Sequence, residues 1–547
     1  MLEGCTPWPE EFVRRYKQAG YWEGRTLGEM LDDAVAKFGP REAVVDDSGT
    51  RYTYDDLGRL SDRLALHLLE LGLEPKDRIL VQLLNVSDFV VFYFASAKAG
   101  VIPVMALPQH RLHEMGFFAE LTQARAYALP SRVKGYDYTE LAEQVRQKVP
   151  SVQKVLVHGD DVPAGYISLK RLLADPTEER VSRNRLRQVR PDPDEVALFL
   201  LSGGTTGLPK LIPRTHNDYI YNSKCNTGFV SFEDETYLAL LPIEHNYPIV
   251  CGLQPILMKG GKFVLCQSAD VDHVMGLVER ERVGILPGVP SLFIRFINHP
   301  NFRKYDLTSL KVLISGAQKL QPDLKPKIEE AFNAKVQEAF GMAEGLITLS
   351  RLTDPLEVRY QTVGFPVSPA DEIAIVDDEG RDVLDGEIGE LICRGPYTLR
   401  GYYKAPEHNQ KAFNNEGFYL TGDLMRRGPG GGLVVEGRRK DMINRGGEHL
   451  SAEEIENLIL THPAVHNAAV IGMPDPDMGE RICAYVIPKP GQTMALPELC
   501  SFLLAKNIAK FKLPERLELV GEFPLTNIGK VSKKDLREDI ANKLKGA

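Results

Sequence analysis

The chain has 547 residues, of which 43% are hydrophobic and 26% charged, with a formal net charge of −9 and a pI near 5.8. These are ordinary values for a globular protein of several domains, and the acidic balance gives no general reason to expect nucleic-acid binding. The seven cysteines are scattered without a CxxC pair, which argues against a zinc knuckle or a disulfide framework and favours a reducing compartment.

No segment has the pattern of a signal peptide or a membrane span. The N-terminal stretch MLEGCTPWPEEF lacks the basic and apolar regions of a signal peptide. The most apolar window, residues 88–107, is broken by Lys98, Gly100 and Pro103. We therefore predict a soluble, cytoplasmic protein with no membrane partner.

The first half of the chain alternates predicted strands and helices. RYTY (51–54) precedes a helix with leucines at 57, 60, 64 and 68, and RILVQLL (78–84) precedes a second helix from Ser87 to about Gly100. VIPVMAL (101–107) is the next strand, and the alternation resumes with strands at 196–201, 235–241, 261–266 and 311–315. Such alternation predicts an α/β fold with helices covering the sheets.

A glycine-rich segment, LSGGTTGLPK (201–210), follows one of these strands. Glycines let backbone N–H groups approach an anion, and the hydroxyls and the lysine add donors and a positive charge. A Walker A loop needs Gly-Lys-[Ser/Thr] opening a helix, whereas Lys210 lies between Pro209 and the strand-like KLIPRTH. We predict a triphosphate-binding loop between two strands, the simple alternative being an ordinary turn. Its residues are Ser202, Gly203, Gly204, Thr205, Thr206, Gly207 and Lys210.

The character of the chain changes near residue 430. A glycine-rich turn leads to a helix with an S-x-x-E capping box formed by Ser451 and Glu454. Strands at 465–473, 481–489 and 516–521 and a helix at 497–507 then predict a small α+β domain. We place the boundary at Lys440, so that the domains are 1–439 and 440–547.

Five motifs carry a family resemblance: LSGGTTGLPK (201–210), EAFGMAEG (338–345), GFYLTGDL (417–424), EGRRKDMINRGGEHLSAEEIE (436–456) and PLTNIGKVSKKDL (524–536). In this order and spacing they resemble the adenylate-forming superfamily of acyl-CoA ligases, nonribosomal peptide adenylation domains and luciferases. The resemblance covers nearly the whole chain. It implies a large N-terminal adenylation domain of α/β subdomains with a small mobile C-terminal lid domain, and a reaction in two steps: a carboxylate and Mg-ATP form acyl-AMP and pyrophosphate, and a thiol then releases AMP.

The resemblance also implies roles for single residues. The loop would hold the β- and γ-phosphates, Glu344 would ligate Mg²⁺, and Asp423 would accept hydrogen bonds from the ribose hydroxyls. Arg438 would support the ribose and phosphate, and Lys530 would bridge the carboxylate and the α-phosphate during adenylation. The adenine-binding residues would be Ser315, Gly316, Ala317, Phe340, Gly341 and Met342. Each charged residue could instead be a solvated surface group or a turn cap.

The resemblance makes Lys440 a hinge. Rotation of the small domain after adenylation would remove Lys530 and bring in the segment with Gly446 and Gly447, past which a pantetheine thiol would reach the acyl-adenylate.

The segment IEHNYPIVCGL (243–253) indicates the acid. It lacks the aspartate typical of amino-acid adenylation and resembles the stand-alone aryl acid–AMP ligases of siderophore biosynthesis, which use 2,3-dihydroxybenzoate or salicylate. Asn246 would bind the 2-hydroxyl of the ring. The other predicted acid-binding residues are His245, Tyr247, Cys251, Gly316, Ala339, Ala343 and Ile347. Cys251, a weak hydrogen-bonding group, favours salicylate over 2,3-dihydroxybenzoate.

The sequence leaves two alternatives for the thiol acceptor. The resemblance implies the phosphopantetheine arm of a separate aryl carrier protein, for which the lysines of the small domain (510, 512, 530, 533 and 534) offer a basic side, unless they are plain solvated surface. An aryl-CoA ligase using free CoA is the alternative, and a non-enzymatic nucleotide-binding protein is disfavoured because all the motifs are retained.

Overall fold

The computed structural model describes residues 1–202, 209–445, 448–506, 508–525 and 531–545. The chain forms two compact units. The larger unit holds most of the chain up to Glu372 together with Cys393–Tyr419, and the smaller unit holds Ile373–Ile392 and the chain from Leu420 onward. The mixed α/β class predicted from the sequence is confirmed in both.

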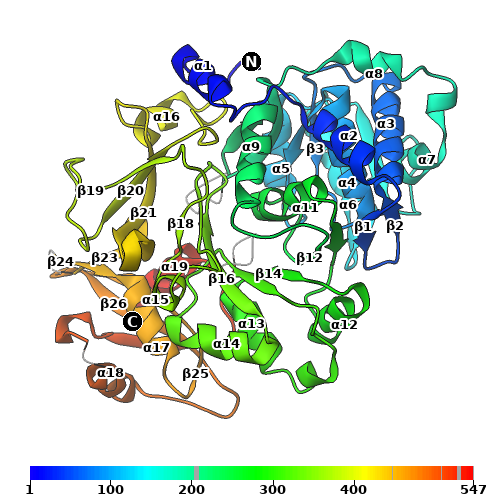
Figure 1. Cartoon of the computed structure of the whole chain (residues 1–547). Helices are drawn as coiled ribbons and strands as arrows, with labels where there is room; N and C mark the ends of the chain where they lie inside the picture. Colours follow the sequence, from blue (N-terminus) through cyan, green and yellow to red (C-terminus); the bar gives the residue numbers. More distant parts are fainter. Residues whose placement is uncertain (203–208, 446–447, 507, 526–530, 546–547) are drawn as a thin grey trace. The chain divides into compact units, whose positions relative to one another are not determined.

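Two large sheets form the framework of the larger unit (Figure 1). The first, in the described chain, has nine strands in the order β18-β17-β16-β15-β14-β12-β13-β1-β2, and its central strands are parallel. Its strands are β1 (Glu42–Asp46), β2 (Arg51–Thr53), β12 (Thr236–Ala239), β13 (Lys262–Leu265), β14 (Ile285–Gly288), β15 (Val312–Ser315), β16 (Lys335–Gly341), β17 (Ile347–Leu349) and β18 (Phe365–Pro366).

The second sheet has the order β11-β10-β4-β3-β5-β8-β9, and β10 and β11 pair antiparallel. Its strands are β3 (Arg78–Val81), β4 (Ile102–Met105), β5 (Ala126–Pro130), β8 (Lys154–His158), β9 (Ile167–Ser168), β10 (Val196–Leu201) and β11 (Leu211–Thr215). The glycine-rich segment therefore connects two strands, as the sequence predicts, and KLIPRTH continues as a strand, not a helix.

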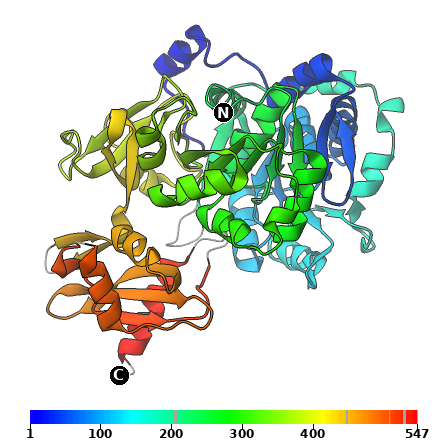
Figure 2. The same ribbon diagram turned by 60° about the horizontal axis from the view of Figure 1, so that its bottom comes forward.

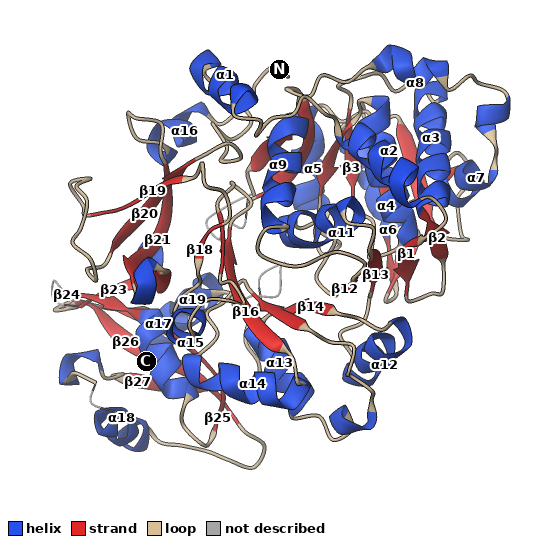
Figure 3. Ribbon diagram, in the orientation of Figure 1, coloured by secondary structure: helices blue, strands red, loops and turns tan. Residues whose placement is uncertain are grey.

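Helices fill the space between the two sheets and cover their outer faces (Figure 3). The helix α4 contacts β1 of one sheet and β4 of the other, which explains why every residue except Asp88 is buried and most are apolar. It ends at Gly100, whose φ of 68° is the left-handed conformation that glycine adopts without strain. The inner helices are α2 (Leu27–Phe38), α3 (Tyr54–Glu70), α4 (Ser87–Ala99), α9 (His216–Asn226) and α11 (Gln254–Met258).

Outer helices complete the two cores of this unit. On the seven-stranded sheet lie α5 (Leu112–Thr122) and α6 (Tyr138–Lys148), and on the nine-stranded sheet lie α12 (Val271–Glu281), α13 (Pro290–Ile297) and α14 (Lys325–Phe332). The remaining elements of the unit are α1 (Glu10–Gln18), β6 (Arg132–Val133), β7 (Tyr136–Asp137), α7 (Leu169–Ala174), η1 (Thr177–Glu179), α8 (Asn184–Val189), α10 (Asn246–Pro248), the π-helix η2 (Ile249–Leu253), η3 (Phe302–Lys304), η4 (Pro322–Leu324), α15 (Leu356–Gln361) and α16 (Pro406–Ala412).

The smaller unit contains a four-stranded and a five-stranded sheet. The first has the order β19-β20-β21-β22, and β27 pairs with β26 at the edge of the second, β24-β23-β26-β25. The elements are β19 (Glu372–Val376), β20 (Gly389–Arg394), β21 (Tyr419–Arg427), η5 (Pro429–Gly431), β22 (Leu433–Arg438), η6 (Arg439–Asp441), β23 (Met442–Arg445), β24 (Glu448–Ser451), α17 (Ala452–Leu460), β25 (Val465–Asp475), β26 (Gly479–Pro488), α18 (Leu496–Ala505), η7 (Lys510–Lys512), β27 (Arg516–Leu519) and α19 (Lys533–Lys545).

The five-stranded sheet is covered on both faces because apolar residues occupy both faces of its long hairpin (Figure 2). Ala468 and Val470 of β25 join one core with α17 and α18, and the intervening Ala469 and Ile471 join a second core with α19. The two-residue period of a strand thus assigns each residue to one helix layer. This arrangement matches the α+β organisation predicted for the C-terminal segment.

Two local predictions are refined at the start of this region. Ser451 caps α17 by accepting a hydrogen bond from the Glu454 N–H (3.2 Å), but the Glu454 carboxylate binds Lys512 (2.7 Å), so only half of the capping box forms. The four-stranded sheet ends at Arg438 and the five-stranded sheet resumes at Met442, on either side of Lys440. The boundary and hinge at Lys440 stay a prediction.

A buried ion pair fixes α14 to β16. Lys325 and Glu338 are both almost fully buried and pair directly, and the ammonium also donates to the carbonyls of Arg359 (3.0 Å) and Tyr360 (2.8 Å). The carboxylate accepts the Leu320 N–H at 2.9 Å. Burial raises the pKa of Glu338, and the pair stabilises the fold only while both partners are present.

Replacement of Lys325 tests this dependence. We expect Lys325→Met to lower the free energy of unfolding by about 3 kcal/mol, because it leaves the Glu338 carboxylate buried without its cation. The double variant Lys325→Met/Glu338→Leu should recover much of the loss. Urea unfolding followed by tryptophan fluorescence reports on this unit, since Trp8 and Trp22 both lie in it. The exposed Lys327 of the same helix is the control, and a loss for Lys325→Met no larger than for Lys327→Met would contradict the argument.

Candidate active site

The two ends of the glycine-rich segment are tied together. The Ser202 N–H donates to the Lys210 carbonyl (2.9 Å), and the Lys210 N–H donates to the Ser202 hydroxyl oxygen (3.0 Å). The Lys210 ammonium lies 5.8 Å from the centre of the Tyr402 ring. The two ends of the connection therefore lie next to each other, and one of them carries the Lys210 ammonium. The predicted residues Gly203, Gly204, Thr205, Thr206 and Gly207 lie outside the described residues.

The predicted adenine-binding turn begins where β15 ends. Ser315 is fully buried, and its hydroxyl has no hydrogen-bond partner among the described residues. The Gly316 N–H donates to the Gly288 carbonyl (3.1 Å), and Ala317 has a φ of 67°, a left-handed conformation that residues with a side chain rarely adopt. The turn is thus strained and carries an unsatisfied polar atom, two features common at binding sites.

Three side chains distant in sequence hold the segment that follows β16. Arg214 of β11 donates to the Ala343 carbonyl (2.9 Å), Asn246 donates to the Met342 carbonyl (3.5 Å), and Tyr402 donates to the Glu344 carboxylate (2.8 Å). Gly345 allows a close approach here, because a Cβ atom would lie 2.5 Å from the Thr398 Cα. Phe340 and Gly341, at the end of β16, precede this segment directly.

The carboxylate of Glu344 has a defined orientation. Its Oε1 accepts the Tyr402 hydroxyl, which also lies 2.9 Å from the Tyr419 hydroxyl, and its backbone carbonyl accepts the Leu399 N–H at 2.7 Å. Glu344 is 9% exposed, so its position is set by these contacts. An oriented carboxylate oxygen is the ligand type that a hard cation such as Mg²⁺ prefers.

Most of the predicted acid-binding residues come together at the same segment. The Tyr247 hydroxyl donates to the Ile314 carbonyl (3.1 Å), and a Cβ on Gly316 would lie 3.5 Å from the Ala339 carbonyl and 3.6 Å from the Tyr247 ring. His245 caps the short helix α10, with its Nδ1 accepting the Tyr247 N–H (3.3 Å). These contacts join residues of β15, β16 and α10 into one group.

Asn246 carries the clearest unsatisfied atom of this group. Its amide nitrogen donates to Met342, but its Oδ1 has no partner among the described residues, although the side chain is only 6% exposed. A buried amide oxygen without a donor costs about 1–3 kcal/mol. Such an atom suits a ligand hydroxyl.

Ile347 of β17 is buried against Gly341, whose added Cβ would lie 3.3 Å from it.

Cys251 lies in the π-helix η2 and is buried. Its thiol donates to the Asn226 side-chain oxygen at 3.7 Å. Burial raises the pKa of this thiol to about 12, so the thiolate needed for nucleophilic chemistry is not populated near neutral pH. Cys251 is therefore a small, weakly polar, buried side chain, and its role in binding the acid stays a prediction.

The predicted ribose-binding residues form a cross-strand pair in the smaller unit. Asp423 of β21 is directly opposite Arg438 of β22, and the Arg438 Nε lies 2.9 Å from the Asp423 carboxylate. Asp423 is buried and follows Gly422, whose φ is 70°. Asp423 therefore lies inside β21, directly after a glycine in the left-handed conformation.

Lys440 lies in the single turn η6 next to this pair. Burial, and secondarily the charge of Arg438, lower the pKa of its ammonium, and its carbonyl accepts a hydrogen bond from Arg537 (3.4 Å). The other residues predicted for the small domain, Gly446, Gly447 and Lys530, lie outside the described residues.

Sequence patterns missed several residues of the site. Arg214, Tyr402 and Asn226 each contact a predicted residue and stand outside the five motifs. Tyr419 lies in the motif GFYLTGDL without a predicted role and contacts Tyr402. The one usable signal was the segment RGYYK (400–404), where two consecutive tyrosines follow a basic turn. The contacts of Arg214, Tyr402 and Asn226 join residues 129, 58 and 25 positions apart, which motif spacing does not reveal.

Comparison with known protein families identifies the class of enzyme that has this fold. Two family models agree: "AMP-binding enzyme" matches residues 31–403, and "AMP-binding enzyme C-terminal domain" matches residues 454–530. The chain belongs to the AMP-binding enzyme family of adenylate-forming, ATP-using ligases.

Relatives in this family match the chain over nearly its whole length. A 2,3-dihydroxybenzoate-AMP ligase of Bacillus subtilis is 44% identical over 100% of this chain and 99% of its own. A salicylyl-CoA synthase / salicylate adenylyltransferase of a Streptomyces species is 44% identical, over 99% and 98% of the two chains. A salicyl-AMP ligase / salicyl-S-ArCP synthetase of Mycobacterium tuberculosis is 38% identical, over 97% and 94%.

Solved structures share the fold. The apo structure of Mycobacterium smegmatis MbtA matches with a TM-score of 0.73 and 38% identity, covering 98% of each chain. The anthranilate CoA ligase AuaEII in complex with anthranoyl-AMP matches with a TM-score of 0.86 at 23% identity, covering 95% of this chain and 98% of its own, which supports the fold alone. Within the described residues, no helix is long and apolar enough to cross a membrane.

The contact between Tyr402 and Glu344 generates a testable expectation. Removing the hydroxyl in Tyr402→Phe leaves the Glu344 carboxylate less constrained, and groups that orient a metal ligand typically contribute 10–100-fold to metal affinity or activity. We expect the Mg²⁺ concentration for half-maximal ATP–pyrophosphate exchange to rise roughly tenfold. Tyr403→Phe is the control, since that ring packs on Phe199. An unchanged Mg²⁺ dependence in Tyr402→Phe would exclude this role.

Proposed function

We propose that the protein adenylates an aromatic carboxylic acid, salicylate in preference to 2,3-dihydroxybenzoate, and transfers the aryl group to the phosphopantetheine thiol of an aryl carrier protein in siderophore biosynthesis. The observation that carries the proposal is the buried, unpartnered Oδ1 of Asn246, beside Tyr247 and the Gly316 turn. A 2-hydroxyl on the ring is a donor of the right kind for this atom. The full-length relatives that act on salicylate and 2,3-dihydroxybenzoate support the same class of acid.

The proposed chemistry balances in two steps. A carboxylate oxygen of the acid attacks the α-phosphorus of ATP, and the bond to the β-phosphate oxygen breaks, giving aryl-AMP and pyrophosphate. A thiol sulfur then attacks the acyl carbon, AMP leaves, and the thiol proton passes to solvent. In the first step, negative charge develops on the phosphates, so the donors of the 202–210 loop and Lys210 would act by stabilising it.

Among the described residues, Glu344 fits the Mg²⁺ that this chemistry uses. Its carboxylate is a hard oxygen donor held by Tyr402, in the segment that follows the predicted adenine-binding strand. When bound, Mg²⁺ supplies neutralisation of phosphate charge. Asp423 would bind the ribose hydroxyls, and Arg438 would support the ribose and the phosphate. Lys530 as the catalytic lysine, Lys440 as the hinge, and Gly446 and Gly447 beside the thiol path remain part of the proposal on the strength of their motifs.

Exchange of labelled pyrophosphate into ATP tests the choice of acid. We expect salicylate to give the highest rate among salicylate, 2,3-dihydroxybenzoate, benzoate and anthranilate. Cys251→Ser should gain activity toward 2,3-dihydroxybenzoate, because a hydroxyl is a stronger donor and acceptor than the thiol. Cys500→Ser is the matched control, since Cys500 lies in the smaller unit on α18.

Two outcomes would contradict this assignment. A wild type that prefers 2,3-dihydroxybenzoate would show that Cys251 does not set the choice. Absence of exchange with every aryl acid would overturn the aryl substrate class itself.

A second candidate differs only in the acceptor. A relative described as a salicylyl-CoA synthase favours an aryl-CoA ligase that uses free CoA. The basic side proposed for carrier binding is weaker than the sequence suggests, because Lys512 pairs with Glu454 (2.7 Å) and Lys533 with Glu456 (2.7 Å). Ion pairs of this kind leave less net charge for a partner.

Direct comparison of the two thiol acceptors, a carrier protein and free CoA, separates the two candidate functions. With salicylate and ATP, we expect faster transfer to a phosphopantetheinylated aryl carrier protein than to CoA at equal concentration, read by mass spectrometry of the acylated carrier and chromatography of salicylyl-CoA. The control is a carrier protein that lacks the serine to which phosphopantetheine is attached. Faster formation of salicylyl-CoA would reject the carrier assignment while leaving the adenylation step intact.

A further inference from the structure

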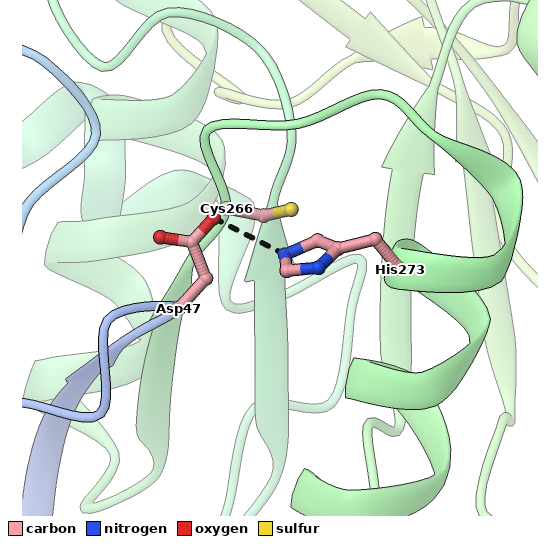
Figure 4. A group of neighbouring side chains, drawn as sticks. All are labelled: Asp47, Cys266 and His273. Atoms are coloured by element: carbon pink, nitrogen blue, oxygen red, sulfur yellow. Dashed lines mark hydrogen bonds and ion pairs between the residues drawn. The ribbon is translucent and has the colours of Figure 1, made fainter.

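Three potential metal ligands converge in the larger unit, on elements that none of the adenylation motifs includes. Asp47 follows β1, Cys266 follows β13, and His273 lies in the first turn of α12. One ligand atom from each lies within 4.8 Å of the other two, and Figure 4 shows the three side chains pointing toward one another. In the part of the chain that the structure describes, this is the one such group of three His, Cys, Asp or Glu side chains.

The sheet register explains the convergence. β1 and β13 are parallel neighbours, and Asp46 pairs with Leu265, so the next residues, Asp47 and Cys266, leave the same edge side by side. Parallel strands place their following loops together. The sequence separation of more than 200 residues between Asp47 and the other two hides the group from spacing-based searches.

The loop that carries two of the ligands is itself well held. The Ser268 hydroxyl accepts the Asp270 N–H (3.1 Å), and the Asp270 carboxylate caps α12 by accepting the His273 N–H (3.0 Å). The Arg295 guanidinium donates to the Ala269 carbonyl. Cys266 is 1% exposed. The positions of Cys266 and His273 are therefore fixed by contacts other than those between the ligands.

The carboxylate of Asp47 is oriented in the way metal ligands usually are. Its Oδ2 accepts the Gln267 N–H (2.8 Å) and its Oδ1 accepts the Gln267 side-chain amide (3.1 Å). Hydrogen bonds from a second layer of groups commonly fix metal-binding carboxylates. Its Oδ2 also lies 3.3 Å from the His273 Nε2.

The distance of 3.3 Å between the Asp47 Oδ2 and the His273 Nε2 suits two arrangements. Two atoms about 2.0–2.1 Å from a tetrahedral Zn²⁺ lie about 3.3 Å from each other, and a plain ion pair of histidine and aspartate has a similar length. The sulfur favours the metal site, because it adds a third ligand atom within 4.8 Å of the other two. Thiolate, imidazole and carboxylate together are the donor set of zinc and similar borderline-soft ions.

We propose that Asp47, Cys266 and His273 form a binding site for Zn²⁺ or a similar divalent transition metal, separate from the Mg²⁺ site expected at Glu344. The metal displaces the thiol proton, which in the metal-free protein is donated to the Ser268 carbonyl (3.0 Å), and this proton passes to solvent. The thiolate and the carboxylate then balance the two positive charges. Three protein ligands leave a fourth position for water, and the site fastens the loop after β13 to the end of β1.

Cobalt substitution tests the site through its sulfur. We expect one equivalent of Co²⁺ to give a thiolate-to-cobalt charge-transfer absorption in the near ultraviolet, which Zn²⁺ abolishes by displacement. Cys266→Ser should remove or strongly reduce that absorption. His273→Gln, which replaces an exposed side chain, should do so independently. Controls are Cys500→Ser and His299→Gln, the latter because His299 also pairs with an aspartate, Asp272 (3.8 Å). Metal bound at Glu344 gives no sulfur band, so the two sites are distinguished.

Zn²⁺ should also raise the unfolding temperature of the wild type and not of His273→Gln, since a ligand that binds the native state stabilises it by mass action. ATP–pyrophosphate exchange should be the same in His273→Gln and the wild type. A wild type without the charge-transfer band, or a band that survives in Cys266→Ser, would overturn the proposal. Because His273 is exposed, its replacement tests the site even if Cys266→Ser does not fold.

Discussion

Hydrogen bonds from distant parts of the larger unit hold the segment between Ala339 and Gly345, and the candidate site depends on them. Residues 339–341 of this segment pair with β17, and the residues that follow leave the ladder. Arg214 and Asn246 donate to the Ala343 and Met342 carbonyls, and Tyr402 donates to the Glu344 carboxylate. Each of these side chains thereby fixes its own element against the same few residues, so the groups of this unit that we propose to bind the acid, the nucleotide and the metal share one support.

The polar atoms that remain unsatisfied are as informative as the bonds that form. Buried polar groups nearly always find partners, so a buried hydroxyl at Ser315 and a buried amide oxygen at Asn246 are costly in the ligand-free chain. Both lie at the carboxyl end of the nine-stranded sheet, where open α/β sheets bind their ligands. The strained turn at Ala317 adds to this cost. The stability of neighbouring packing, including the Lys325–Glu338 pair, holds these groups in place.

The sequence predicts most of the framework because its signals are local. The strand and helix alternation, the end of α4 at Gly100 and the strand after the 201–210 segment all follow from periodicity and from the conformations open to glycine and proline. The contacts of Tyr402 with Glu344 and of Cys251 with Asn226 could not be predicted, since they join residues brought together only by packing. The Asp47 group is hidden for the same reason: its register depends on the pairing of two strands more than 200 residues apart. The place of Asp423 inside β21 depends likewise on its pairing with Arg438.

The two hydrogen-bonding groups that face the acid in this proposal are unequal, and their inequality predicts an uneven specificity. An acid without a 2-hydroxyl would leave the Asn246 oxygen buried and unpaired, at a cost of about 1–3 kcal/mol, or roughly fivefold to more than a hundredfold in affinity. An acid without a 3-hydroxyl would leave nothing unpaired at Cys251, because the thiol already donates to Asn226. A buried thiol that is weakly polar also gives little to a hydroxyl that arrives there. Selection should therefore be strict at the 2-position of the ring and permissive at the 3-position, which is the pattern expected of a site shaped for salicylate.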